Sequence, residues 1–277
     1  MKTRRLFLLG LTAVFAAACV QGQAENPQAT LPEGEVIEAA TPLATKTYAD
    51  VPDVLWAEGD CITAYLGTDA KGTYQLKEGA GTTHGKFTKV SGSLTGDPID
   101  ANYAIYSFNG EGIFDKGKLQ VDLPGTQTFV DGSFGPGANT MVAVSDDKVF
   151  YFQNVGGYFV VPVTGNVTVK SITVKGGDGE TLAGRAIIVF GKEGPQIETI
   201  RRSLEEVRVV CAEPVVLDAE KPAEFWFVLP PTRFTMGMTV TVEYNDGQTM
   251  EFSPSAKSFS VLRSTVYRMA PIDVRKP

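Results

Sequence analysis

The 277-residue chain has only one histidine, His84, and three cysteines. One histidine and dispersed cysteines cannot form a His/Cys metal cluster, and three cysteines are too few for a disulfide scaffold. We therefore predict no bound metal and no cofactor. His84 lies in the turn-like stretch Gly-Thr-Thr-His-Gly, which favours a loop residue over a catalytic base.

Motifs of enzymes and of nucleic-acid-binding proteins are also missing. The sequence contains no G-x-S-x-G nucleophile elbow and no phosphate-binding P-loop. Its carboxylate pairs, Asp146-Asp147 and Glu205-Glu206, are sequence neighbours, and neighbours on a strand point to opposite faces, unlike the facing pair of a glycosidase. The net charge of −7 opposes binding to phosphate backbones. We predict a protein that is not an enzyme and binds no nucleic acid.

The apolar run Leu6–Ala18 is too short to span a bilayer, which needs about 20 residues. It follows the basic start MKTRR and ends in three alanines, the pattern of an export signal. Cys19 follows at once, which resembles the bacterial lipoprotein signal, although Ala16 stands where leucine is usual. We predict a signal peptide over residues 1–18 and a lipid on Cys19. The alternative is ordinary cleavage that leaves Cys19 unmodified.

If Cys19 carries lipid, Cys61 and Cys211 remain, far apart in the sequence. We expect two buried, unpaired thiols rather than a bridge, since buried free cysteine behaves as a small hydrophobic residue. Residues 19–46 are rich in Ala, Pro, Gln and Glu and are predicted to form a tether. One short strand is expected within it, at Glu35–Glu38.

Beyond the tether the pattern is that of β-structure. Val167–Lys170 and Ile172–Lys175 alternate apolar and polar residues, the period of half-buried strands. Met238–Tyr244 and Thr249–Phe252 flank an Asp-Gly pair and predict a hairpin with a type I′ turn. Short strands between glycine-rich turns favour an all-β sandwich fold. A Gly-Gly pair between two such patterns divides the chain into predicted domains at 47–160 and 161–277.

Four stretches of the sequence resemble the fimbrillin family, the type V pilus subunits of Bacteroides and Porphyromonas relatives. They are W-x-x-G-D-x-I at Trp56–Ile62, a Y-x-A-x-Y-like segment at Tyr103–Tyr106, V-x-S-I-x-V with L-A-G within Gly157–Phe190, and F-x-F-V-L-P-P at Phe225–Pro231. Ser107 departs from the pattern, because a proline often follows the second of these segments. The resemblance covers about residues 50 to 277.

This resemblance implies two tandem Greek-key, transthyretin-like β-sandwiches. It also implies a surface-exposed outer-membrane lipoprotein that becomes a stalk, tip or anchor subunit of a fimbria, without enzymatic activity. Its partners would be other fimbrial subunits, the outer membrane through the lipid, and a host or bacterial surface ligand. Assembly would proceed by donor-strand exchange: a protease removes an N-terminal segment with a first strand, and the C-terminal strand of another subunit fills the groove.

The sequence departs from the family at the processing site. Arginine-specific proteases activate many relatives, yet no arginine lies between Arg5 and Arg185. Lys46 is the only basic residue between Arg5 and Lys71, so it is the candidate site; otherwise the chain stays uncut as an anchor.

The donor-strand candidate is the C-terminal run from residue 266 to 274. By period 2 we expect one face to hold four apolar residues: Val266, Ala270, Ile272 and Val274. Arg268 interrupts that face, and Pro271 removes one backbone donor. The alternative is that this run is simply the last strand of its own domain.

Two further expectations concern aromatic and apolar side chains. The second sandwich should bury Val167, Val169, Ile172 and Val174, with Trp226 beneath the facing sheet. A rival function is a glycan-binding surface lipoprotein, whose platform would use aromatic side chains: Trp56, Tyr65, Tyr74 or Tyr103. A third interpretation is a monomeric surface β-protein with an unknown partner.

Overall fold

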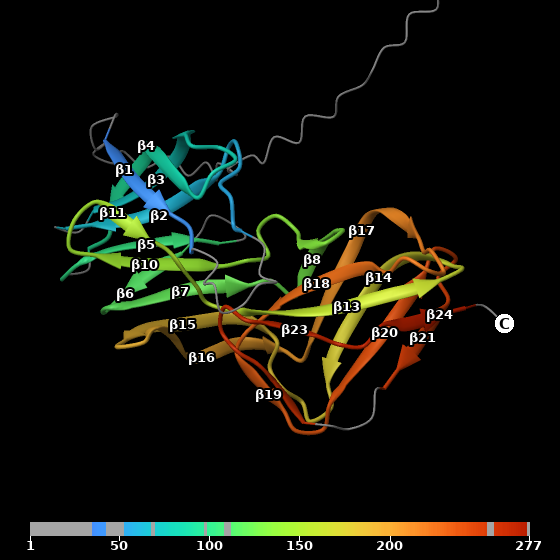
Figure 1. Ribbon diagram of the computed structural model, residues 1–277. Coiled ribbons are helices and arrows are strands. Elements are labelled where there is room, and N and C mark those ends of the chain that lie inside the picture. Colours follow the sequence, from blue (N-terminus) through green and yellow to red (C-terminus); the bar gives the residue numbers. More distant parts are fainter. Residues whose placement is uncertain are drawn as a thin grey trace, which may run out of the picture.

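The computed structural model describes residues 35–42, 53–67, 70–96, 99–107, 112–253 and 258–275. Within these ranges the chain forms twenty-four strands and no helix, so the prediction of an all-β protein is confirmed. The strands gather into an N-terminal half and a C-terminal half that lie side by side (Figure 1).

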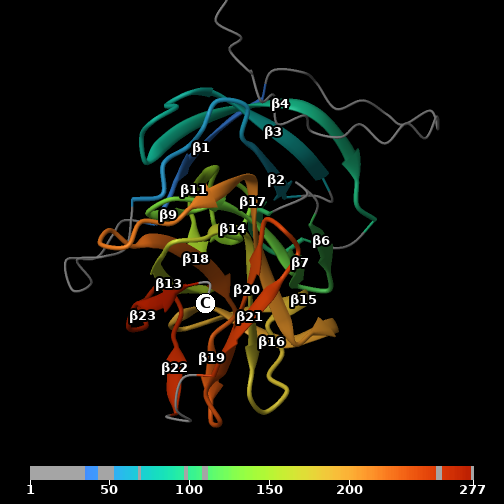
Figure 2. The same ribbon diagram turned by 90° about the vertical axis from the view of Figure 1, so that its right-hand side faces the viewer.

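The largest sheet has eight strands in the order β11-β1-β4-β3-β2-β5-β10-β12. The bounds are β1 (Val36–Ala40), β2 (Cys61–Leu66), β3 (Ala70–Glu78), β4 (His84–Leu94), β5 (Asn102–Tyr106), β10 (Met141–Ser145), β11 (Val149–Tyr151) and β12 (Gln153–Asn154). The sheet is strongly curved, and β3 and β4 arch over the top of the molecule in Figure 2. Its concave face encloses an apolar core that includes Ile37, Trp56, Phe87 and Phe150.

A second sheet covers part of the outer face of the first. Its order is β16-β15-β7-β6, and its strands are β6 (Ile113–Asp115), β7 (Lys118–Leu123), β15 (Ala183–Gly191) and β16 (Gly194–Leu204). Alternate residues of β2 and β5, Tyr65 and Ile105, pack against Leu119 of β7 and Ile188 of β15. Both faces of β2 and β5 are therefore buried.

The C-terminal half is built from two main sheets. One has the order β18-β13-β23 with β24 also on β13; its strands are β13 (Gly157–Gly165), β18 (Ala223–Leu229), β23 (Val266–Arg268) and β24 (Ile272–Val274). The other has the order β21-β20-β14-β17-β8-β9; its strands are β8 (Thr126–Val130), β9 (Ser133–Phe134), β14 (Thr168–Gly176), β17 (Glu206–Val216), β20 (Met238–Tyr244) and β21 (Thr249–Phe252). A small sheet pairs β19 (Thr232–Phe234) with β22 (Phe259–Val261).

The core between these sheets contains the four residues predicted for it. Val167, Val169, Ile172 and Val174 are buried there, which confirms the alternation that was read from the sequence. The hairpin β20–β21 is also confirmed, but its turn is not type I′. That turn requires positive φ at both central residues, and only Gly247, with φ 83°, is positive here. Gly247 in the loop instead adopts the left-handed conformation that favours glycine.

Strands from the two halves of the sequence share sheets. The hairpin β15–β16 pairs with β7, and Arg185 of β15 donates two hydrogen bonds to Asp122 of β7 at 2.8 and 2.9 Å. Conversely, β8, which comes from the N-terminal half of the sequence, pairs in parallel with β17 in a sheet of the C-terminal half. The domain ranges 47–160 and 161–277, and their transthyretin-like topology, therefore stay predictions.

Trp226 is buried as predicted, but it lies on the opposite face of β18 from the sandwich core. Phe225 and Phe227 point into that core, whereas Trp226 packs beside Tyr158 and beneath the guanidinium of Arg268. Both faces of β18 are covered, so a continuous apolar run does not reveal which face the tryptophan occupies.

The cysteines behave differently from one another. Cys211 is buried and free, as predicted, and burial raises the pKa of its thiol to about 11. Cys61 is disulfide-bonded, which corrects the expectation of a second free thiol.

Candidate functional site

Strand β1 is the expected strand near Glu35–Glu38, and it lies between two strands that are distant in sequence. It runs antiparallel to β4 and parallel to β11. Backbone hydrogen bonds hold both edges: Glu38 N–H donates to Lys148 O at 3.1 Å on the β11 side, and Lys89 N–H donates to Glu35 O at 2.9 Å on the β4 side. We call the space between β4 and β11 the β1 slot.

The inner side of the β1 slot is apolar and tightly packed. Ile37 is 1% exposed and Ala39 is 3% exposed, and both face the core of the curved sheet. The indole N–H of Trp56 donates to the carbonyl of Ala39 at 3.3 Å. The ring of Trp56 packs edge-on against that of Phe87, with the ring centroids 5.0 Å apart. The slot therefore buries the apolar side chain of Ile37 and fixes the backbone of Ala39 through a side-chain hydrogen bond.

A cluster of charges holds the start of β1. The carboxylate of Glu35 accepts a hydrogen bond from the Tyr74 hydroxyl at 2.9 Å, contacts Lys148, and lies 3.6 Å from the ammonium of Lys89. Lys89 is 7% exposed, so its charge is almost withdrawn from water. Burial would raise the pKa of Glu35, but hydrogen bonds from Lys148 and Tyr74 and the two lysine charges lower that pKa below its usual value.

Burial and the contact with Glu35 also shift the pKa of Tyr74. Burial, followed by the hydrogen bond and charge of Glu35, raises the pKa of Tyr74 well above its usual value, so the phenol stays protonated and donates. Sequence reasoning missed this cluster. A signal was present, because Lys89 follows Gly85 and Phe87 at period 2 on the inward face of β4.

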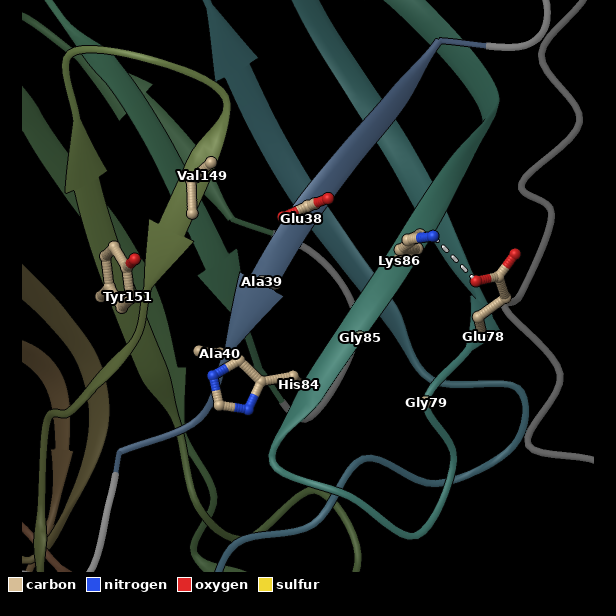
Figure 3. A pocket seen from close by; sticks show the side chains of 10 residues that line it. All are labelled: Glu38, Ala39, Ala40, Glu78, Gly79, His84, Gly85, Lys86, Val149 and Tyr151. Carbon is tan, nitrogen blue, oxygen red and sulfur yellow. Dashed lines mark ion pairs between the residues drawn. The ribbon is translucent and has the colours of Figure 1, made fainter.

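The outer side of the β1 slot forms a shallow hollow of about 280 Å³ (Figure 3). Residues of β1, β4 and β11 line it, among them His84 and Tyr151, and an ion pair between Lys86 and Glu78 at 3.0 Å marks one rim. The imidazole of His84 is exposed, and its Nδ1 lies 3.0 Å from the hydroxyl of Thr83. Among the described residues that line the hollow, none is a serine, threonine or cysteine. In the described ranges no group of His, Cys, Asp or Glu side chains is placed to hold a metal ion.

Two predicted site residues, Cys19 and Lys46, lie outside the described residues. The C-terminal run is described, and its strands β23 and β24 pair in parallel with β13 of their own half. In this structure the run forms two short strands on β13 of the same chain, and both the donor role and its alternative stay predictions.

The four apolar residues of that run do not share one face, which corrects the expectation. Ile272 and Val274 contact the sandwich core, Val266 packs on the opposite side near Trp226, and Ala270 is exposed. Pro271 cannot donate to a ladder, and the pairing stops at Met269 and resumes at Ile272. That break shifts the alternation by one residue.

The aromatic residues of the glycan-platform hypothesis are all buried. Trp56, Tyr65, Tyr74 and Tyr103 are each 7% exposed or less. The hydroxyl of Tyr65 donates to the carbonyl of Gly112, and that of Tyr103 donates to Asp100. None of these rings presents a face to solvent, so they cannot stack on a sugar.

No family model and no curated protein matches the sequence. The structure is similar to that of a candidate cell adhesion protein from Bacteroides uniformis, with 17% identity, 88% of this chain and 93% of that chain covered, and a TM-score of 0.50. A candidate cell adhesion protein from Bacteroides ovatus is 12% identical over 87% and 91% of the two chains, with a TM-score of 0.49. The tip fimbrial protein Mfa3 from Porphyromonas gingivalis is 10% identical over 86% and 94%, with a TM-score of 0.32.

The fold resembles that of the Bacteroides uniformis cell adhesion protein. At 17% identity the likeness to the Bacteroides uniformis protein establishes the fold, and function requires a separate argument from the site. None of the described residues belongs to a helix that is long and apolar enough to cross a membrane.

Proposed function

We propose that this chain is a non-enzymatic surface lipoprotein that serves as a subunit of an adhesive fimbria. The β1 slot is the observation that carries the proposal. A strand from the N-terminal region completes a sheet whose neighbouring strands, β4 and β11, come from later in the chain. Removal of β1 would expose Trp56 and Phe150 and leave the edges of two strands unpaired. Such an edge is a template for an added strand.

In the proposed assembly, the chain is exported, lipidated at Cys19 and attached to the outer membrane. Cleavage in the segment that follows β1, with Lys46 as the candidate site, would free β1. A strand from another subunit would then enter the β1 slot. An uncut chain would keep β1 in place and remain at the base of the fimbria as an anchor.

The names of the similar structures support this proposal. They include cell adhesion proteins of three Bacteroides species, a fimbrial protein of Bacteroides ovatus and a tip fimbrial protein. None of these names denotes an enzyme, which agrees with the absence of a catalytic motif in the sequence. The glycan-binding alternative loses its support, because its four aromatic residues are buried.

The proposal is tested by isolating the protein from the outer membrane of its native host. A fimbrial subunit that assembles by strand exchange should form SDS-resistant ladders in unheated samples. A glycan-binding lipoprotein should instead run as a monomer and be retarded in gels that contain polysaccharide. Ladders that are absent at every stage of growth would contradict the fimbrial role.

A further inference from the structure

We propose that the β1 slot selects its occupant by charge, and that it accepts a strand from a different polypeptide rather than from a second copy of this chain. The occupant carries an acidic residue, a large aliphatic residue two places later, and alanine or glycine four places later. This inference rests on the proposed function, because it names the partner of the strand-exchange site.

The acidic position follows from the two lysines at one end of the slot. Lys89 comes from β4, and Lys148 lies immediately before β11, so both belong to the walls of the slot. The carboxylate of Glu35 is the acidic group that both contact. If β1 leaves, the nearly buried Lys89 loses that carboxylate. A buried charge without its partner is costly, so an occupant with a carboxylate here is favoured over a neutral one.

The small position follows from crowding at the other end. Ala39 lies opposite Gly85 in the ladder with β4. A Cβ atom added to Gly85 would lie 2.6 Å from Leu76 and 2.9 Å from Phe87, so this part of the slot has no spare volume. Ala39 is itself 3% exposed. Between the two ends, the pocket of Ile37 accepts one large aliphatic side chain.

The C-terminal run of this chain does not fit that pattern in either direction. Its only acidic residue from 265 to 277 is Asp273. Two places after Asp273 stands Arg275, and two places before it stands Pro271. Either one would have to occupy the pocket of Ile37. Arginine would bury a charge there, and proline would remove a backbone donor. The chemistry of the slot therefore disfavours a homopolymer.

The experiment uses the full chain with a site for a sequence-specific protease placed in the segment 43–52. After cleavage, fluorescent peptides compete for the β1 slot, and fluorescence anisotropy gives their affinities. The probes are the native peptide of residues 35–42, its Glu35→Gln and Glu38→Gln variants, and the peptide of residues 265–277. Glu38 is a matched control, because it has the same charge on the same strand but points to solvent.

We expect the native and Glu38→Gln peptides to bind within about twofold of each other. The Glu35→Gln peptide should bind about tenfold more weakly or worse, as expected for the loss of charge-assisted hydrogen bonds. The C-terminal peptide should bind at least as weakly as the Glu35→Gln peptide. Equal binding of the native and Glu35→Gln peptides would overturn charge selection, and tight binding of the C-terminal peptide would overturn the requirement for a different polypeptide.

A separate arm keeps this inference distinct from the proposed function. If the cut protein does not exchange even the native peptide, strand release fails, and with it the proposed function. Charge recognition is then tested in the uncut chain by a double-mutant cycle of Glu35→Gln and Lys148→Gln, with Glu38→Gln in place of Glu35→Gln as the control. Coupling of the first pair and none in the control supports charge recognition. Additive effects in both cycles would overturn it.

Discussion

The side-chain amide of Gln127 pairs with both backbone groups of Val228. Its Nε2 donates to the Val228 carbonyl at 2.8 Å, and its Oε1 accepts from the Val228 N–H at 3.0 Å. Gln127 is 4% exposed and comes from β8, whereas Val228 lies on β18 in the other sheet. The Gln127 side chain therefore satisfies the backbone N–H and carbonyl of Val228 at the edge of β18. It also links the two sheets of the sandwich.

We expect Gln127→Glu to destabilise the protein by about 1–3 kcal/mol or more, because a carboxylate cannot donate to the Val228 carbonyl and would be buried with its charge. Urea unfolding measures the change. The exposed Gln196→Glu substitution is the control and should change the free energy of unfolding by less than about 0.5 kcal/mol. Equal effects of the two substitutions would show that the amide pairing contributes nothing.

The charge cluster at Glu35 predicts a pH dependence of stability. The pKa of Glu35 is lowered below its ordinary value of 4.5, so the folded state favours the ionised form. Its contribution is fully present above about pH 4.5 and is lost as the pH falls through the lower, folded-state pKa. Thermal melts should therefore show a smaller loss of stability on acidification for Glu35→Gln than for the wild type.

The control for this prediction is Glu38→Gln, which removes an exposed carboxylate of the same strand. Its melting temperature should follow the wild-type curve across the same pH range. Parallel curves for the wild type and Glu35→Gln would mean that Glu35 has the same pKa in the folded and unfolded chain.

We expect truncation of the Trp226 side chain to lower the stability of the protein strongly. It is 3% exposed and packs between Tyr158 and Arg268, so Trp226→Ala should cost about 3 kcal/mol or more. Tyr151→Ala is the matched aromatic control, because Tyr151 is 68% exposed and should be nearly neutral. Denaturant titrations compare the two. A neutral Trp226→Ala would mean that this ring is exposed in solution.

Cys19 predicts a specific modification. We expect a diacylglyceryl thioether on Cys19, to be found by mass spectrometry of the N-terminal peptide from membranes. An unmodified N-terminal peptide, starting at Val20 or later in cells that lack a processing protease, would contradict this prediction.

We expect truncation of the C-terminus to affect both assembly and stability. Truncation after Met269 removes β24, including Val274, which is fully buried and whose carbonyl accepts from Asn166 N–H at 3.2 Å. We expect a folded, surface-displayed monomer with a lower unfolding midpoint that no longer assembles with partner pilins on native gels. Assembly of the truncated protein at the wild-type level would contradict the donor role of this C-terminus.

Sequence patterns predicted the features that depend on local alternation. Val169 and Val174 lie in the core because period 2 fixes a face within one strand, and the hairpin β20–β21 follows from its Asp-Gly pair. Patterns could not predict what depends on the covering layer. Trp226 faces away from the sandwich core because a strand buried on both sides has no polar face to orient it. Pro271 shifted the alternation of the C-terminal run, which a simple period cannot anticipate.

The candidate site was predicted in its position but not in its chemistry. The short strand in the tether was expected near Glu35–Glu38, and β1 lies there. The cluster of Glu35 with Lys89 and Lys148 was missed, because it joins three segments whose proximity only the folded sheet creates. Ion pairs between distant segments leave no periodic signal in a sequence.

The pairing of β1 with β11 also constrains the order in which the chain can fold. Glu35 contacts a lysine 113 residues later, so the β1 slot does not exist until the chain has been synthesised through residue 151. Contacts of such high sequence separation form late, because loop closure must precede them. The edge of β1 that pairs with β11 therefore stays open longer than the edge that pairs with β4, and closure of the β1 slot is a late step in folding. A competing strand that reaches the slot before β1 meets no barrier of strand release.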